Sequence, residues 1–522
     1  MTTKAPNHIR WGVILTYTSL GINILLSILY TPVMLRILGQ SEHGLYSTVS
    51  STMSWLSLLG LGIGSSYIRF YAKYKVTERE DKIASLNGLF LLMFLMIGTV
   101  SMLCGIVIAN NLHLVFANGM TAEEYVTARK LALIVALDLS ISFPASVFSA
   151  IIRANEKFIQ SKLASLFQNI CTPLLTLPLL LSGYGSVGMV AATTIIDFIA
   201  YSYNVTYCFR VLHTKFSFRS FEKGILRQIF GFSIFIALNS LIAQFATGLD
   251  KLFITRYVNT AAASVYAIGC SLYSYYTAFS GAVSGVFAPR IHKITARYED
   301  DKGKLKSALT EQFIKLGRIQ FLIQMLMLTG IIFFGKPFIH LWAERGGQDY
   351  SKSYYIALLL CVSSTIPLIQ NIGVTIQQAQ NKHRYRTLFY GIMTALNVAL
   401  TIWLVQVIGE IGAAVGTAAA TILLDGIVMN VFYQRHLYLD IPKFWTSILK
   451  MTKGLLIPVV LGITVIGFYR IDTVLKLIGG IAGYTAVYCF SMWFFSMNAE
   501  EKELCTGRLM RAFKRGNRNR EN

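Results

Sequence analysis

Polar side chains that recur inside long apolar stretches are the parts of this sequence best suited to do chemistry. Between residues 229 and 254, Ser240, Gln244, Thr247 and Lys251 follow one another at spacings of four, three and four, which places them on one helix face. A charge at the centre of a bilayer costs on the order of 3 kcal/mol, so a buried lysine points to function. The stripe predicts either a water-filled passage, in which Lys251 binds an anion, or hydrogen bonds between packed helices.

Two other apolar stretches carry similar polar stripes. Asn23, Ser27 and Thr31 follow one face of residues 11–35, which end close to Arg36. In residues 131–152, Pro144 predicts a kink or a break. The stripe there consists of Asp138, Ser142, Ser146, Ser149 and Arg153.

The charged residues near position 250 do not share one helix face. Asp250 and Lys251 are adjacent, and Arg256 lies about 140° around a regular helix from Lys251. The three can therefore face one passage only if the helix end distorts. For Arg36 and Arg256, extension of the side chain to the membrane surface is a full alternative to ligand binding.

Two aspartates occupy matching places in a repeated segment. Residues 187–193 and 415–421 both fit the pattern VGxxAAT, and Asp197 and Asp425 follow each at the same distance, with an offset of 228. Together with Asp138, these carboxyl groups are candidates for coupling to a proton or another cation. The alternative is a carboxyl group that only forms a hydrogen bond with a neighbouring helix.

The elements that position these residues must be membrane-spanning helices. The 522-residue chain is 54% hydrophobic and only 14% charged, and its apolar runs approach the length needed to cross a bilayer. Such runs must be helical, because lipid offers no partner to the backbone. Although the net charge is +22, no nucleic-acid-binding module is present, and we expect the basic residues to face anionic lipids.

Several classes of catalytic or metal site have no visible motif. The seven cysteines form no CxxC pair, so neither a metal site nor a disulfide framework is predicted. There is no P-loop for ATP and no HExxH, and none of the eight histidines lies deep inside a predicted span. We therefore expect no enzyme, no resident cofactor and no metal.

Fourteen spans are predicted, with both chain ends in the cytoplasm. Of 47 lysines and arginines, 37 fall on the amino-terminal side of the membrane and 10 on the other, as the positive-inside rule requires. The first span has no cleavage site after it and is expected to be retained. The spans lie near 11–35, 45–67, 85–109, 131–152, 163–182, 186–208, 229–254, 261–288, 316–334, 353–377, 387–408, 411–433, 454–469 and 474–496.

Internal repeats divide the spans into two matching halves. Besides the VGxxAAT segments, Arg36 with Tyr46 matches Arg256 with Tyr266 at an offset of 220. The repeats predict two pseudo-repeated six-helix lobes followed by two further helices, with a substrate site at the centre. The expected parts are a first lobe over 1–210, a cytoplasmic linker over 211–228, a second lobe over 229–435, helices 13 and 14 over 436–498, and a basic tail over 499–522.

The chain resembles the polysaccharide (Wzx-like) flippases of the multidrug/oligosaccharidyl-lipid/polysaccharide (MOP) exporter superfamily. Beyond the six-plus-six-plus-two organisation, the resemblance rests on residues 44–47 (GLYS), 249–254 (LDKLFI), 265–269 (VYAIG) and the two VGxxAAT segments. It implies a two-lobed, MATE-like all-α transporter with a cationic lumen, lined largely by spans one and seven.

The resemblance also implies a substrate and a location. Similar proteins move undecaprenyl-pyrophosphate-linked oligosaccharides from the inner to the outer leaflet of the bacterial cytoplasmic membrane. The head group would then bind at Lys251, Arg36 and Arg256, and polar residues would line the lumen and contact the sugars; the predicted site adds Asp250, Gln244, Thr247, Asn23 and Tyr266. Expected partners are membrane lipids and polysaccharide polymerase and assembly proteins, and a H+ or Na+ gradient is the candidate energy source.

Three alternatives compete with this interpretation. A MATE-like drug or cation antiporter shares the two-lobed form but typically has twelve spans. A flippase of the peptidoglycan lipid precursor would share the fold and the pyrophosphate head group. A polymerase or membrane glycosyltransferase would need a large loop or a catalytic domain, and the sequence has neither.

Overall fold

The protein is built from helices that run through nearly all of its described length. The computed structural model describes residues 7–60, 63–76, 79–116, 119–219, 224–298, 300–344, 347–380 and 382–503. Within these ranges there are helices and no strand, which confirms the predicted all-α class. A helix closes its own backbone hydrogen bonds, so it is the form expected of an isolated segment in lipid.

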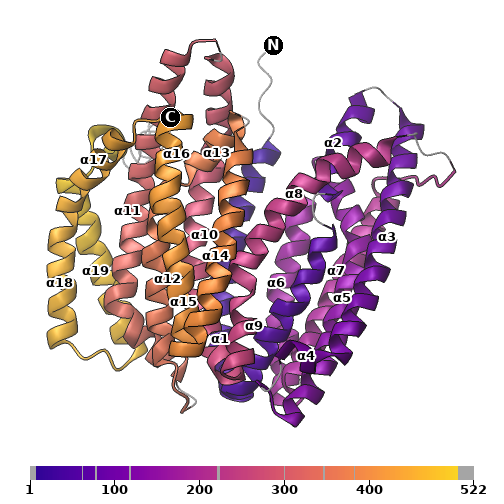
Figure 1. The fold of residues 1–522 in the computed structure, drawn as a ribbon, viewed down its shortest axis with the longest axis horizontal. Helices are drawn as coiled ribbons and strands as arrows, with labels where there is room; N and C mark the ends of the chain where they lie inside the picture. The colour runs from indigo at the N-terminus through magenta and orange to yellow at the C-terminus, as the bar shows by residue number, and fades with distance from the viewer. Residues whose placement is uncertain are drawn as a thin grey trace, which may run out of the picture. The chain divides into compact units, whose positions relative to one another are not determined.

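The elements fall in the following order along the chain (Figure 1). The first are α1 (Asn7–Met53), η1 (Ser54–Gly60), α2 (Ile63–Val76), α3 (Glu80–Asn110), α4 (Leu112–Phe116), α5 (Ala122–Ala154), α6 (Phe158–Leu181), α7 (Gly185–Arg210), α8 (Ile225–Gly248), α9 (Asp250–Tyr257) and α10 (Thr260–Arg297). They are followed by α11 (Lys302–Trp342), α12 (Ser351–Ile369), α13 (Ile372–Ala379), α14 (His383–Ile408), α15 (Glu410–Thr421), η3 (Ile422–Val428), α16 (Met429–His436), α17 (Ile441–Met451), η4 (Thr452–Leu455), α18 (Leu456–Phe468) and α19 (Val474–Phe495).

The chain is a multi-pass membrane protein. In the part that the structure describes, eleven helices are long and apolar enough to cross a membrane. The predicted number of fourteen spans is not confirmed. Helices α8, α9 and α10 overlap the predicted spans at 229–254 and 261–288 but are not among the eleven.

Several helices bend or change type where the sequence prediction placed simple ends. Helix α1 continues through the predicted loop after residue 35, and only Gly39, with φ of 75°, interrupts it. A residue with a side chain is strained at this φ, so glycine suits the break. Helix α5 continues through Pro144, and residues Ile422–Val428 form a short π-helix within predicted span twelve.

By internal contacts the chain forms two compact units. Unit 1 contains Met1–Ile268, Arg345–Gln348 and Thr394–Gly416, and unit 2 contains Gly269–Glu344, Asp349–Met393 and Thr417–Asn522. The lobes predicted from sequence repeats are a different division, and they stay a prediction.

Unit 1 is organised around helices that pack side by side. Helix α5 packs against both α3 and α7, and α6 packs against α1 and α7 (Figure 1). Tyr67, Phe90 and Asn87 illustrate the packing, because the Tyr67 ring meets the Phe90 ring edge-on at 5.2 Å while its hydroxyl donates to Asn87 Oδ1 at 2.7 Å. The apolar ring is thereby buried without leaving its polar end unpaired.

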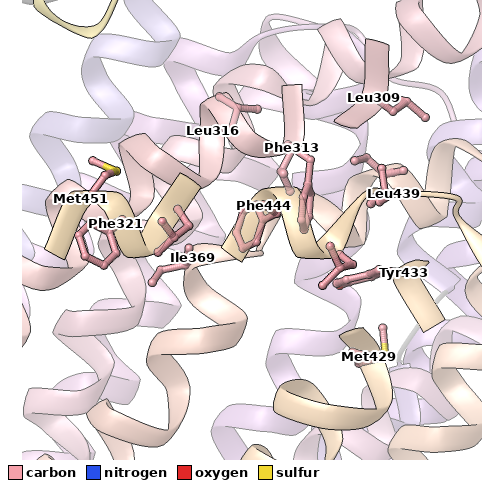
Figure 2. Packing of buried hydrophobic residues seen from close by; sticks show 14 of the residues in the cluster. Leu309, Phe313, Leu316, Phe321, Ile369, Met429, Tyr433, Leu439, Phe444 and Met451 are labelled. Atoms are coloured by element: carbon pink, nitrogen blue, oxygen red, sulfur yellow. The ribbon is translucent and has the colours of Figure 1, made fainter. Parts of the chain in front are cut away.

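Unit 2 has an aromatic core between α11, α16 and α17 (Figure 2). The rings of Phe313 and Phe444 lie 4.6 Å apart, and Tyr433 meets Phe313 edge-on at 5.7 Å. Phe444 can approach α11 because residue 317 is glycine, and a Cβ there would lie 2.3 Å from the Phe444 ring. The short helix α17 is therefore held by ring packing into a groove of α11.

A buried ion pair joins α11 to the chain that follows α19. Arg318 Nε and a second guanidinium nitrogen donate to the two carboxylate oxygens of Glu501, at 2.5 and 2.9 Å. The two side chains are only 12% and 3% exposed. Beside them the Lys315 ammonium bonds Glu500 and lowers the pKa of that carboxyl, so this neighbouring bond is present at neutral pH and is lost in acid.

We predict that Arg318→Leu destabilises unit 2, because it leaves Glu501 buried without its cation. Loss of one partner of a buried pair costs about 3–5 kcal/mol, which should lower the apparent melting temperature of the detergent-solubilised protein by several degrees. Lys304→Leu is the matched control, since the Lys304–Asp301 pair is 73% and 45% exposed and is worth about 0–1 kcal/mol. Equal melting temperatures for the two variants would contradict a stabilising role for the buried pair.

Candidate functional site

The predicted polar stripe of span seven ends where α8 passes into α9. Helix α8 ends at Gly248 and α9 begins at Asp250, and Leu249 between them keeps right-handed helical backbone angles, so the three neighbouring charges still point in different directions. The residues around this transition lie in unit 1 and form a cluster that we call the junction. The junction comprises α9, residues 260–266 of α10, residues 43–55, α4 and the start of α5.

Asp250 and Tyr266 are brought together inside the junction. They are 3% and 2% exposed, and the Tyr266 hydroxyl donates a hydrogen bond to Asp250 Oδ2. The interaction links the first turn of α9 to α10. In this arrangement the tyrosine hydroxyl is the hydrogen-bond donor to a buried carboxylate. The predicted role of both residues in substrate binding stays a prediction.

Lys251 follows Asp250 but is placed differently. Its side chain is partly exposed, and its charge interacts with the ring of His43. His43 is buried on α1, where Nδ1 shares a hydrogen bond of 2.7 Å with Ser264 Oγ. His43 is not among the predicted site residues because it falls between two predicted spans, although it directly precedes the GLYS segment that supports the family resemblance.

Arg256 is part of the packing of the junction. Its Nη1 donates to the carbonyl oxygens of Leu114 and Val115, each at 2.9 Å, and so binds the exposed carbonyl end of α4. This bond to a neighbouring helix is neither of the two roles that the sequence left open. Arg36, the other predicted arginine, is exposed on α1.

Hydroxyl hydrogen bonds complete the junction. Thr48 and Thr255 share one of 2.8 Å between their hydroxyl oxygens, and Thr260 donates to Glu124 Oε1 at 2.6 Å. The Glu124 carboxylate is itself held by the backbone of Thr121 at the start of α5. Four short stretches of chain are thereby joined by hydroxyl groups.

Two glycines allow the backbones of the junction to approach one another. A Cβ on Gly44 would lie 1.7 Å from the carbonyl oxygen of Thr260, and a Cβ on Gly119 would lie 1.8 Å from that of Thr255. Gly44 opens the GLYS segment, so close packing of α1 on α10 is one physical reason for that motif.

The other stripe residues are divided between described and undescribed positions. Gln244 donates to Ser54 Oγ at 3.0 Å, which ties α8 to η1. The side chain of Thr247 lies outside the described residues. Asn23 is exposed on α1 and lines a second polar region of unit 1.

Of the three candidate coupling aspartates, two lie together. Asp138 on α5 and Asp197 on α7 are both in unit 1, and their charges interact. Asp197 Oδ1 also accepts a hydrogen bond of 2.7 Å from Gln168 of α6. Two neighbouring carboxylates repel each other when both are ionised, so binding of a proton or a cation reduces the repulsion.

Asp425 lies in unit 2, within the π-helix. Its Oδ1 accepts a hydrogen bond of 2.8 Å from Tyr390, whose hydroxyl oxygen in turn lies 3.2 Å from Arg386 Nη2. The guanidinium of Arg386 also covers the Tyr390 ring, 4.5 Å from its centre. The two repeat-related aspartates therefore have different partners, an amide for Asp197 and a tyrosine for Asp425.

A search for metal-binding clusters is negative for the described ranges. There, no three His, Cys, Asp or Glu side chains are grouped so that they could hold a metal ion. The sequence-based expectation that the protein needs no metal stays a prediction.

Comparison with known families places the chain. Residues 9–295, more than half of its length, match the family described as polysaccharide biosynthesis protein. The chain belongs to this family. No curated protein is a significant sequence match.

Solved structures of MOP transporters share the fold of this polysaccharide biosynthesis family member. A lipid II flippase MurJ in an inward closed conformation superposes with a TM-score of 0.67 at 16% identity, covering 95% of this chain and all of that one. An inward-facing MATE multidrug resistance transporter gives 0.58 at 17% identity, covering 81% and 96%. An outward-facing MATE transporter gives 0.56 at 18% identity, covering 82% and 96%. The predicted MATE-like fold is confirmed.

We predict that Gly44→Ala disrupts the junction, since the added Cβ meets backbone that cannot rotate away. Overpacking of this kind costs about 1–3 kcal/mol or more, and should reduce both the yield of monodisperse protein and its melting temperature in detergent. Gly64→Ala is the matched control, because no atom lies within 4 Å of its added Cβ. Wild-type behaviour of Gly44→Ala would mean that the close approach of α1 to α10 is not required for folding.

Proposed function

We propose that this chain is a flippase that moves a polyprenyl-pyrophosphate-linked oligosaccharide from the inner to the outer leaflet of the bacterial cytoplasmic membrane. Membership of the polysaccharide biosynthesis family and the MOP fold support a transporter of this kind. The observation that carries the proposal is Lys251, a partly exposed cation on α9 within the buried polar junction.

The chemistry of such a substrate requires a cation within the membrane. A pyrophosphate–sugar head group is anionic and strongly hydrated, so it cannot cross hydrocarbon unaided. Lys251 would form charge-assisted hydrogen bonds with the phosphate oxygens, and Arg36 is exposed and able to assist. Arg256 is occupied by the carbonyl groups of α4, so we assign it to holding the junction closed in this conformation.

The junction is suited to open and close during transport by alternating access. The hydroxyl bond of Thr48 with Thr255 is worth about 0.5–1.5 kcal/mol, and that of Thr260 with the Glu124 carboxylate about 1.5–3 kcal/mol. A substrate can shift a conformational equilibrium only by its difference in affinity for the two states, which is commonly a few kcal/mol. The total free energy of a few such bonds across the junction is within that range.

A cation gradient is the proposed energy source, and Asp138 with Asp197 is its proposed site. Their carboxylates interact inside the membrane part of unit 1, where binding of a proton or sodium ion would reduce their repulsion. Asp425 is given a secondary role, because Tyr390 and Arg386 already compensate it.

The proposed orientation places both chain ends in the cytoplasm. It follows from the distribution of 37 and 10 basic residues on the two sides of the membrane. The substrate would arrive from cytoplasmic enzymes and pass on the far side to polysaccharide polymerase and assembly proteins, which are the proposed partners.

A second candidate function is translocation of the peptidoglycan lipid precursor. The similarity to a lipid II flippase extends over 95% of this chain, and a lipid-linked precursor of that kind carries the same type of pyrophosphate head group. A drug or cation antiporter is a third candidate because MATE transporters share the fold. The partly exposed Lys251 disfavours an organic cation at the junction.

We predict that Lys251→Ala abolishes surface polysaccharide while the protein remains abundant in the membrane. Surface polysaccharide is measured by lectin or antibody labelling, and lipid-linked oligosaccharide should accumulate in the inner leaflet, as in a deletion strain. Lys476→Ala is the control, because that lysine pairs with Asp472 on the exposed end of α19.

Two results would count against the proposal. Normal polysaccharide in the Lys251→Ala strain would remove Lys251 from the substrate path. Absence of accumulated lipid-linked oligosaccharide in the deletion strain, together with a change in resistance to organic cations, would favour the antiporter.

We further predict that Asp197→Asn uncouples transport from its cation gradient. In proteoliposomes, wild-type flipping should respond to an imposed H+ or Na+ gradient, and Asp197→Asn and Asp138→Asn should each lose most of that response. Asp472→Asn serves as the control, since its carboxyl lies outside the membrane-spanning helices. An unchanged response in both membrane variants would exclude this pair as the coupling site.

A further inference from the structure

Unit 1 contains a second polar region, which adjoins the junction at Tyr46. An open pocket of about 590 Å³ lies between α1, α6 and α7. Volumes of this size are typical of small-molecule sites. We call it the chamber; its lining is Asn23, Leu26, Ser27, Tyr30, Tyr46, Gln168, Asn169, Thr172, Pro173, Thr176 and Asp197.

The chamber is lined mainly by neutral hydrogen-bonding groups. It presents three amides, three aliphatic hydroxyls, two tyrosines and one carboxylate, whereas Leu26 and Pro173 are the apolar members. Among the lining residues that the structure describes, none is a lysine or an arginine. This composition differs from that of the junction, where the partly exposed Lys251 is the proposed anion ligand.

Helical spacing places these groups on facing surfaces. On α6, residues 168, 172 and 176 follow at intervals of four, and on α1, residues 23, 27 and 30 follow at intervals of four and three. Pro173 has no N–H to donate to the carbonyl oxygen of Asn169, so the backbone of α6 adds an acceptor beside the Asn169 side chain.

Part of this polar lining is not used by the protein. Within the described chain, the side chains of Asn23, Asn169 and Thr172 form no hydrogen bond with other protein groups. Amides and hydroxyls without hydrogen-bond partners raise the free energy of a membrane protein unless water or a ligand binds them. A hydroxyl-rich ligand is the chemical complement of such a surface.

The charge and polarity of the lining disfavour binding of the pyrophosphate and of the polyprenyl tail in the chamber. A pyrophosphate would meet the carboxylate of Asp197 with no cation among the described lining residues, and a polyprenyl tail would leave the amides unpaired. An organic cation could pair with Asp197, but that carboxylate already accepts a hydrogen bond from Gln168 and would leave the other amides unused. Sugars use neutral donors, neutral acceptors and ring faces together.

We propose that the chamber binds neutral sugar residues of the transported oligosaccharide while Lys251 binds its pyrophosphate. The assignment rests on the proposed flippase function. It places the sugar-binding region on α1 and α6 and the anion-binding region on α9. Asp197 belongs to both the chamber and the Asp138–Asp197 pair, so sugar occupancy can influence cation binding directly.

The test compares two ligands that differ only in the sugar. Purified protein in nanodiscs is titrated with the lipid-linked oligosaccharide extracted from the deletion strain and, separately, with undecaprenyl pyrophosphate. Asn169→Leu and Thr172→Val should each weaken binding of the first ligand at least tenfold and leave binding of the second unchanged. Lys251→Ala should weaken both.

Thr464→Val is the matched control, because Thr464 is exposed on α18 and bonds only its own helix. Melting temperatures of all variants verify folding. Equal loss of both ligands in Asn169→Leu and Thr172→Val, or no loss of either, would overturn the chamber as a sugar site while the flippase proposal stands.

Two further outcomes separate the alternatives. If wild-type protein binds neither ligand, both proposals fail together. Tetraphenylphosphonium is the probe for an organic cation. If it binds wild-type protein and Asp197→Asn removes that binding while the lipid-linked oligosaccharide still binds normally to Asn169→Leu, the chamber is a cation site and the sugar assignment is wrong.

Discussion

The absence of hydrogen-bonding solvent in the bilayer constrains the whole structure. Every polar group in a membrane helix must find a partner within the protein, in water held by the protein, or in a ligand. At the junction, partners come from other helices: Thr48 finds Thr255, and Glu124 accepts from Thr260. In the chamber, partners are incomplete. The polar residues of the junction therefore stabilise the fold, whereas those of the chamber are available to bind a ligand.

The sequence predicted the helical class and the membrane setting because both depend on composition and run length. It could not place helix breaks, which depend on single residues. The loop predicted before Tyr46 is replaced by an interruption at Gly39 within one helix. Glycine is too common in apolar runs to be a signal by itself.

The site was predictable in its charges but not in their partners. The sequence showed that Asp250, Lys251 and Arg256 could not share one face of a regular helix, and the structure gives each a different environment. Asp250 accepts a hydrogen bond from Tyr266, and Arg256 donates to carbonyl groups of α4. Lys251 is partly exposed. His43 and Asn169 were missed because their partners or their cavity come from helices distant in sequence, which no spacing rule connects.

The π-helix at Ile422–Val428 has a consequence for the two matching VGxxAAT segments. Its backbone hydrogen bonds run from residue i to residue i+5, so each of its turns contains more residues than an α-helical turn. Asp425 lies in that segment, whereas its repeat counterpart Asp197 lies in the uninterrupted helix α7. Equal spacing in the sequence thus gives the side chains after the two segments different directions around the helix axis, and a chimaera that exchanged the segments would misalign them.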